Sequence, residues 1–262
     1  MVQYIIFDTE SVPDGRLIKL VKYRDEDISE EEAIEKAKKQ ALESSGGKTD
    51  FLPPVFQFPV ALCLLKIEQD LSINELVLLD EPHFRSFEIV KDFWKGLNHY
   101  KVPIISYNGR GFDLPLMEVA AFRYGLSVPY HFSSRNSTRY RFSDKHIDLM
   151  DWITNYGACR QGYSLDLFSK LLGKPGKMAT KGSDVYEMFL RGEIREINEY
   201  CAYDVFDTYF IFLRHLVLLG KITIEMEKSI VQLAKKWITE NSLKHPFLKE
   251  YLANWGDWSP WL

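Results

Sequence analysis

Two carboxylates follow an apolar stretch near the beginning of the sequence. In "QYIIFDTESV" a predicted strand, roughly Val2 to Phe7, leads directly into Asp8 and Glu10. Residues two apart in a strand project to the same side, so both carboxylates face one place. Such a pair can bind a divalent cation through hard oxygen ligands. Taken alone, the same two acids could instead cap a nearby helix or lie in solvent.

Two later stretches carry acids in comparable settings. In "SYNGRGFDLP" Asn108 ends a predicted strand, and a glycine-containing turn brings Asp113 to the start of a helix. Active-site residues often lie at such junctions, although Asp113 alone could be a simple N-cap. In "NEYCAYDVFDTYFIF" Tyr200 and Asp204 share one face of a predicted buried helix. A buried acid needs a partner, which here is either a cation or an arginine.

Considered together, the acids at positions 8, 10, 113 and 204 favour one interpretation. Oxygen ligands without nearby His or Cys select Mg²⁺ or Mn²⁺ over zinc. Four convergent carboxylates repel one another unless cations neutralise them. A two-metal site for phosphoryl transfer therefore explains all four acids. Asp207, one helical turn further on, is either a structural acid or a support for this site.

The three stretches also resemble a known family. "FDTES", "YNGRGFDLP" and "YCAYD" resemble the three exonuclease motifs of the DEDD superfamily of 3'-5' exonucleases, which has a ribonuclease H-like fold. The Tyr-x-x-x-Asp form of the third motif resembles the tyrosine subgroup (DEDDy), which includes the proofreading domains of family B DNA polymerases. The text "HIDLMDWI", "SLDLFSKLLGKPGK" and "GSDVYEMFLRGEI" is similar to stand-alone predicted exonucleases related to those domains. The resemblance covers roughly residues 2–215.

The resemblance implies a role for each matching residue. Asp8 would bridge two divalent cations, Mg²⁺ or Mn²⁺. Glu10 and Asp204 would complete the site of the cation that activates water, and Asp113 would hold the second cation. Tyr200 would orient the attacking water. A phenol stays protonated at neutral pH, so Tyr200 is expected to position the water and not to act as a strong base.

Other residues are predicted to bind the substrate. We expect Thr9 and Asn108 to contact the terminal nucleotide, or else to make local backbone hydrogen bonds. Residues 130–146 interleave aromatic residues with Arg139 and other cations, a pattern that suits a single strand. Part of that stretch could equally be a hairpin strand with a solvated face. "GKPGKMATKG" (173–182), which contains Lys177, is expected to close on the phosphate backbone or to be a flexible loop.

The predicted function is metal-dependent 3'-5' exonuclease activity on single-stranded DNA ends, which releases 5'-nucleoside monophosphates. The same chemistry on RNA is the main alternative, because the 2'-OH contacts that discriminate the two cannot be read from the sequence. A non-catalytic nucleic-acid-binding module is a third reading, although a binder would not require all four acids. The sequence identifies no protein partner. The terminal tryptophans could dock one or fold back onto the body; they are Trp255, Trp258 and Trp261.

The elements that must position these residues indicate an α/β fold. Strands are predicted at 2–7, 60–67, 73–80 and 102–108, with a short one within 145–153. Helices are predicted after Ser29, which forms a capping-box pattern with Glu32, and at 84–100, 114–125, 164–173, 183–192, 193–220 and 223–241. We therefore expect a mixed β-sheet flanked by α-helices, and the resemblance implies that it has the ribonuclease H-like fold. The exonuclease domain would span 1–215, and 216–262 would form a helical extension packed on it as part of the same domain.

Composition excludes several other classes. The 262 residues carry a formal net charge of -4, which argues against coating duplex nucleic acid through a large basic face. No apolar run reaches the ~18 residues of a membrane span, and no secretory signal is evident. Cys63, Cys159 and Cys201 show no ligand spacing and are expected to be buried, reduced thiols of a cytoplasmic protein.

Overall fold

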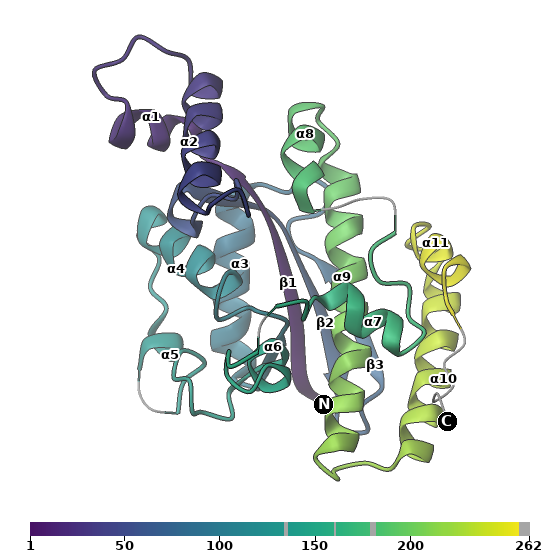
Figure 1. The fold of residues 1–262 in the computed structure, drawn as a ribbon. Coiled ribbons are helices and arrows are strands. Elements are labelled where there is room, and N and C mark those ends of the chain that lie inside the picture. Colours follow the sequence, from purple (N-terminus) through teal and green to yellow (C-terminus); the bar gives the residue numbers. More distant parts are fainter. Residues whose placement is uncertain (134–135, 160, 179–181, 257–262) are drawn as a thin grey trace.

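A computed structural model describes residues 1–133, 136–159, 161–178 and 182–256 of the chain. Its centre is a five-stranded sheet with the order β3-β2-β1-β4-β5 (Figure 1). The strands are β1 Val2–Pro13, β2 Gln57–Glu68, β3 Ile73–Leu78, β4 Ile104–Ser106 and β5 His146–Asp148. β1, β2 and β3 are antiparallel neighbours, whereas β4 pairs in parallel with both β1 and β5. The predicted mixed sheet is confirmed.

β1 is longer than predicted. The sequence placed Asp8 and Glu10 beyond the end of this strand, but β1 continues to Pro13 and both acids lie within it. The strand continues because β2 pairs with it throughout, with Pro13 opposite Gln57. A register shift follows Glu10, and such bulges re-aim side chains next to active sites.

Helices make up most of the remaining structure. They are α1 Gly15–Lys22, α2 Glu30–Ser44, α3 Ser86–Tyr100, α4 Asp113–Tyr124, α5 Pro129–Phe132, α6 Leu149–Ile153, α7 Leu165–Leu171, α8 Val185–Leu190, α9 Ile194–Leu218, α10 Ile224–Asn241 and α11 Leu248–Ala253. The predicted capping box at Ser29 is present, because its hydroxyl accepts from the Glu32 N–H and the Glu32 carboxylate accepts from the Ser29 N–H. α8 does not start at Ser183 as predicted, because a 3-10 turn spans Gly182–Asp184 and puts Asp184 at its N-cap.

Alternate residues of β1 face two different helical layers. Tyr4 packs its ring against Phe212 of α9, whereas Phe7 packs against Phe93 of α3. α9 therefore covers one face of the sheet, and α3 lies with α4 on the other (Figure 1). Because Asp8 and Glu10 are an even number of residues from Tyr4, their side chains lie on the α9 face.

The C-terminal helices pack on α9, as the sequence predicts. Tyr251 of α11 stacks on Tyr203, and Trp237 of α10 lies against Phe206. Residue 215, the predicted end of the exonuclease domain, lies inside α9, which runs without a break from Ile194 to Leu218. Trp255 folds back against Phe210, whereas Trp258 and Trp261 lie outside the described residues.

α1 and α2 form an excursion between β1 and β2 at one end of the sheet (Figure 1). These helices have a small apolar core of their own, which consists of Ile18, Ala33, Ile34, Ala37 and Leu52. The excursion returns to the sheet through a 3-10 turn at Pro54–Phe56. It therefore brings residues from about position 50 next to β1.

Three further expectations are settled by the fold. The stretch 130–146 is not a hairpin, because its described residues before His146 form α5 and turns. Cys159 is exposed and not buried, because it lies in a surface turn after α6; Cys63 and Cys201 are buried, and all three thiols are free. Within the described part of the chain, no helix is long and apolar enough to cross a membrane.

Candidate active site

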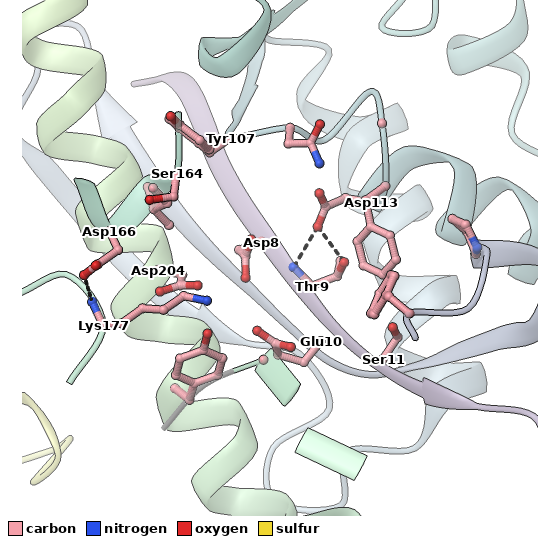
Figure 2. A pocket seen from close by; sticks show the side chains of 18 of the residues that line it. Asp8, Thr9, Glu10, Ser11, Tyr107, Asp113, Ser164, Asp166, Lys177 and Asp204 are labelled. Atoms are coloured by element: carbon pink, nitrogen blue, oxygen red, sulfur yellow. Dashed lines mark hydrogen bonds between the residues drawn. The ribbon is translucent and has the colours of Figure 1, made fainter. Parts of the chain in front are cut away.

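Three carboxylates converge at the floor of one cavity, whose volume is about 1060 Å³. Asp8 and Glu10 come from β1, and Asp204 comes from α9. One oxygen of each lies within 4.8 Å of the others. Figure 2 shows the three side chains pointing toward one another across the space between strand and helix. The two-residue period of β1 and its packing against α9 together produce this convergence.

Asp113 lines the same cavity from its opposite side (Figure 2). It is the first residue of α4 and is buried. Its Oδ1 accepts hydrogen bonds from the Thr9 N–H at 3.0 Å and from the Thr9 hydroxyl at 2.6 Å. The Thr9 side chain, which was predicted to contact the nucleotide or to make a local bond, thus holds Asp113 of α4 against β1.

Burial and mutual repulsion raise the pKa values of Asp8, Glu10, Asp113 and Asp204. Burial, followed by the charges of the other acids, holds the pKa of Asp8 and of Glu10 well above the ordinary values. Burial raises the pKa of Asp204 to about 7 and that of Asp113 to about 6. Near pH 7 a carboxyl group with such a pKa is either protonated or ionised at a cost in free energy. A bound cation would stabilise the ionised form.

Tyr200 lies one turn before Asp204 and lines the same cavity. Burial, with the charges of Asp204, Glu10 and Asp8, raises its pKa far above that of a free phenol. The hydroxyl is therefore protonated at any physiological pH and can donate a hydrogen bond. Beneath the cavity, the Cys201 thiol donates to the backbone oxygen of Asp8 at 3.3 Å and fixes β1 against α9.

A tight turn brings Asn108 to the cavity. Asn108 has a φ of 68°, a left-handed conformation that asparagine tolerates. Asp148 at the end of β5 accepts from the backbone N–H groups of Asn108 and Arg110, both at 2.9 Å. A Cβ on Gly109 would lie 2.2 Å from the Ser106 hydroxyl oxygen, so only glycine fits there. Asp148 ends β5 and is the N-cap of α6, and an aspartate at such a strand-to-helix junction is a sequence signal that could have identified it.

Lys177 is the one cationic side chain among the described residues that line the cavity. Its charge lowers the pKa of Glu10 and Asp204, against the larger effect of burial. Figure 2 shows it extending toward these acids. Arg139 is not brought to the site, because it donates to Glu118 of α4 at 3.1 Å and is absent from the described lining of the cavity.

One wall of the cavity is apolar and was not predicted from the sequence. It consists of Phe51, Leu52, Pro53, Pro54 and Phe112. The Phe51 and Phe112 rings lie 5.3 Å apart, and Phe51 is 55% exposed. Nothing in the local sequence of these residues could place them beside β1. Tyr107 and Ser164 line the cavity as well.

The residues present fit divalent cations. The three convergent carboxylates offer hard oxygen ligands and no thiolate or imidazole, which is the donor set of Mg²⁺ or Mn²⁺. Their raised pKa values are those of a cluster that lacks sufficient positive charge. Asp8, Glu10 and Asp204 would hold a cation, and Asp113 lies across the same cavity.

Comparison with known proteins agrees with the fold. The chain is similar to the family B DNA polymerase of the hyperthermophilic archaeon Pyrobaculum calidifontis, with a TM-score of 0.52 and 16% sequence identity. The match covers 83% of this chain and 25% of the polymerase chain, so the chain spans about a quarter of that protein. This likeness supports the predicted ribonuclease H-like fold. The search of curated proteins gave no match.

A family model identifies the class of protein. Residues 49–255 match the model of predicted 3'-5' exonucleases related to the exonuclease domain of PolB. The chain belongs to this family, and the prediction that it is a 3'-5' exonuclease is confirmed at that level. The matched range includes Asp113, Tyr200 and Asp204, whereas Asp8 and Glu10 precede it.

Proposed function

We propose that this protein is a metal-dependent 3'-5' exonuclease of the tyrosine subgroup that removes 5'-nucleoside monophosphates from single-stranded DNA ends. The convergence of Asp8, Glu10 and Asp204 within 4.8 Å is the observation that carries the proposal. These carboxylates, with Asp113, would hold two Mg²⁺ or Mn²⁺ ions. When bound, such ions lower the pKa of water and stabilise charge on the attacking and leaving oxygens.

The chain's own side chains would orient the reactants. The protonated Tyr200 hydroxyl donates a hydrogen bond that positions the attacking water, which is a task of alignment. Lys177 extends over the acid cluster, where its ammonium can contact a phosphate oxygen of the scissile bond. Thr9 maintains the position of Asp113 through its two hydrogen bonds.

The cavity favours a single-stranded end as the substrate. Phe51 and Phe112 present aromatic rings to the cavity that contains the acids, and unstacked bases stack on such rings with little sequence preference. Asn108 lines the same cavity and offers an amide to the terminal nucleotide. A base inside a double helix has both faces covered by its neighbours, so it must leave the duplex before it can stack on this wall.

Digestion of matched oligonucleotides tests the proposal. We expect wild-type protein with Mn²⁺ to release mononucleotides from the 3' end of single-stranded DNA, and to release them more slowly from RNA or duplex DNA. Asp204→Asn should lower the rate by at least about 10³-fold, because it removes a ligand charge from the cation site. Glu240→Gln, which changes only an exposed ion pair with Lys236, is the matched control.

Each other outcome has a definite meaning. Equal rates for Asp204→Asn and Glu240→Gln would refute the site assignment. Faster digestion of RNA would make the protein an exoribonuclease with the same chemistry. Oligonucleotide binding without any cleavage would favour a non-catalytic module.

A further inference from the structure

Lys177 reaches the acid cluster from an irregular part of the chain. It lies between α7 and the 3-10 turn before α8, where residues 174–178 belong to no helix or strand. A long side chain on such a segment has many rotamers, and fixing one of them costs conformational entropy. A defined position for its ammonium therefore requires that its backbone be held by something else.

Two side chains of α7 hold that backbone. Asp166 Oδ1 accepts a hydrogen bond from the Lys177 N–H at 2.8 Å, which Figure 2 marks with a dashed line. Lys170 Nζ lies 3.3 Å from the Lys177 carbonyl oxygen and donates to it. Asp166 and Lys170 also form an ion pair with each other, one turn apart on the same helix. The two residues thus form hydrogen bonds with the peptide groups on both sides of the Lys177 Cα.

Gly176 is required for this approach. Its φ is +59°, in the left-handed region that L side chains rarely adopt. A Cβ at this position would lie 2.5 Å from Asp166 Oδ1 and 3.2 Å from Lys170 Nζ. Any larger residue would therefore displace the Asp166 carboxylate and the Lys170 ammonium from the Lys177 backbone.

α7 in turn packs against the helix that carries Asp204. Asp207 of α9 is fully buried and accepts from the Tyr251 hydroxyl of α11 at 2.6 Å. Burial raises its pKa to about 7, and the neighbouring Ser169 of α7 and Gly176 oppose that rise. The segment before Lys177 thus lies close to α9, the helix that carries Asp204.

We propose that Asp166, Lys170 and Gly176 form a clamp that positions Lys177 over the carboxylate cluster. These three are positioning residues, because they act through Lys177 and hold no part of the reacting phosphate. The clamp rests on the proposed exonuclease function for its catalytic consequence. Its effect on the electrostatics of the acid cluster does not depend on catalysis.

Gly176→Ala tests the clamp without changing any charge. Gly220→Ala is its matched control, because Gly220 has a similar φ of +65° but nothing within 4 Å of a Cβ. Both variants carry similar backbone strain, and only the first displaces the Asp166 and Lys170 side chains. We expect Gly176→Ala to lower kcat/KM by roughly 10- to 100-fold, as misplacing a catalytic group does, and Gly220→Ala to stay within about twofold of wild type.

A double-mutant cycle with Lys177→Met identifies the route of the effect. If Gly176 acts through Lys177, the Gly176→Ala change should have almost no further effect on kcat/KM in a Lys177→Met background. Equal, additive losses in both backgrounds would overturn the proposal. So would normal kcat/KM in Gly176→Ala if Lys177→Met alone is impaired.

Calorimetry of Mn²⁺ binding to the substrate-free protein gives a readout that is independent of turnover. The Lys177 charge opposes a cation at Glu10 and Asp204, so Lys177→Met should tighten Mn²⁺ binding by roughly three- to tenfold. Gly176→Ala should tighten it too, Gly220→Ala should not, and the double variant should bind no tighter than Lys177→Met. If Lys177→Met binds Mn²⁺ more tightly but Gly176→Ala has unchanged affinity, the clamp is refuted.

A wild-type protein that releases no nucleotide would instead refute the proposed function. The Mn²⁺ binding measurements would still test the clamp.

Discussion

At the scale of single residues, four buried acids in this cavity destabilise the folded protein. Burial separates Asp8, Glu10, Asp113 and Asp204 from water and also strengthens their repulsion. Such a cluster lowers the free energy of unfolding unless positive charge is supplied. Functional sites commonly combine burial and like charge in this way, so the instability itself points to a ligand.

Asp8→Asn should therefore have opposite effects in two conditions. Without divalent cations the variant should melt higher than wild type, by about 2–6 °C, because one source of repulsion is gone. With saturating Mn²⁺ the wild-type protein should gain far more than the variant, because the variant has lost a ligand. Differential scanning calorimetry in EDTA and in Mn²⁺ measures both. A variant that melts lower than wild type in EDTA would contradict the repulsion argument.

The pH dependence of stability follows from the same raised pKa values. Asp204 titrates at about 7 and Asp113 at about 6 in the folded protein, above an unfolded value near 4. Between these values the native state binds more protons than the unfolded state, so stability falls as pH rises from about 4 to 7. Urea unfolding in EDTA at pH 5 and pH 7.5 should show this loss. Asp204→Asn should reduce the difference.

Tyr200→Phe isolates the role of the phenol. The ring still fills its buried place, so we expect the melting temperature and the Mn²⁺ affinity to change little. kcat should fall by roughly 10- to 100-fold, because the attacking water loses a positioning hydrogen bond. Single-turnover digestion and calorimetry separate the two quantities. A loss of Mn²⁺ binding would show instead that Tyr200 maintains the cation site.

At the scale of elements, the turn between β4 and α4 is the least tolerant part of the site. Gly109 has no space for a Cβ beside Ser106, whereas Gly96 of α3 has nothing within 4 Å. Gly109→Ala should therefore cost about 2–3 kcal/mol of stability and displace Asp113, with a loss of activity. Gly96→Ala should be neutral or stabilise by about 0.5–1 kcal/mol, because it removes glycine from a helix. Chemical denaturation of both variants checks the contrast.

At the scale of the whole molecule, the C-terminal helices support the site from behind. Tyr251 of α11 donates to Asp207, which lies one turn beyond Asp204 on α9. Tyr251→Phe leaves that buried carboxyl without its shortest hydrogen bond and should cost about 1–3 kcal/mol. Tyr140→Phe, at a partly exposed position, should cost almost nothing. Equal melting temperatures for the two variants would contradict a structural role for this contact.

The sequence by itself determined those features that depend on local pattern. Period-two spacing predicted that Asp8 and Glu10 share a face, and helical spacing paired Tyr200 with Asp204. The capping box followed from the spacing of Ser29 and Glu32, and the mixed sheet followed from the order of the predicted strands and helices. These predictions hold because backbone geometry fixes side-chain direction over a few residues.

Only the tertiary structure decided which distant residues meet. β1 continues past Asp8 and Glu10 because β2 pairs with it. Some 50 residues separate the paired positions, so no local sequence pattern could predict this pairing. Thr9 bonds Asp113 across 104 positions, Phe51 reaches the cavity through the α1–α2 excursion, and Arg139 is held away from it by Glu118. Each of these contacts depends on how layers pack, because non-local contacts form where buried surfaces fit and are not encoded in neighbouring residues.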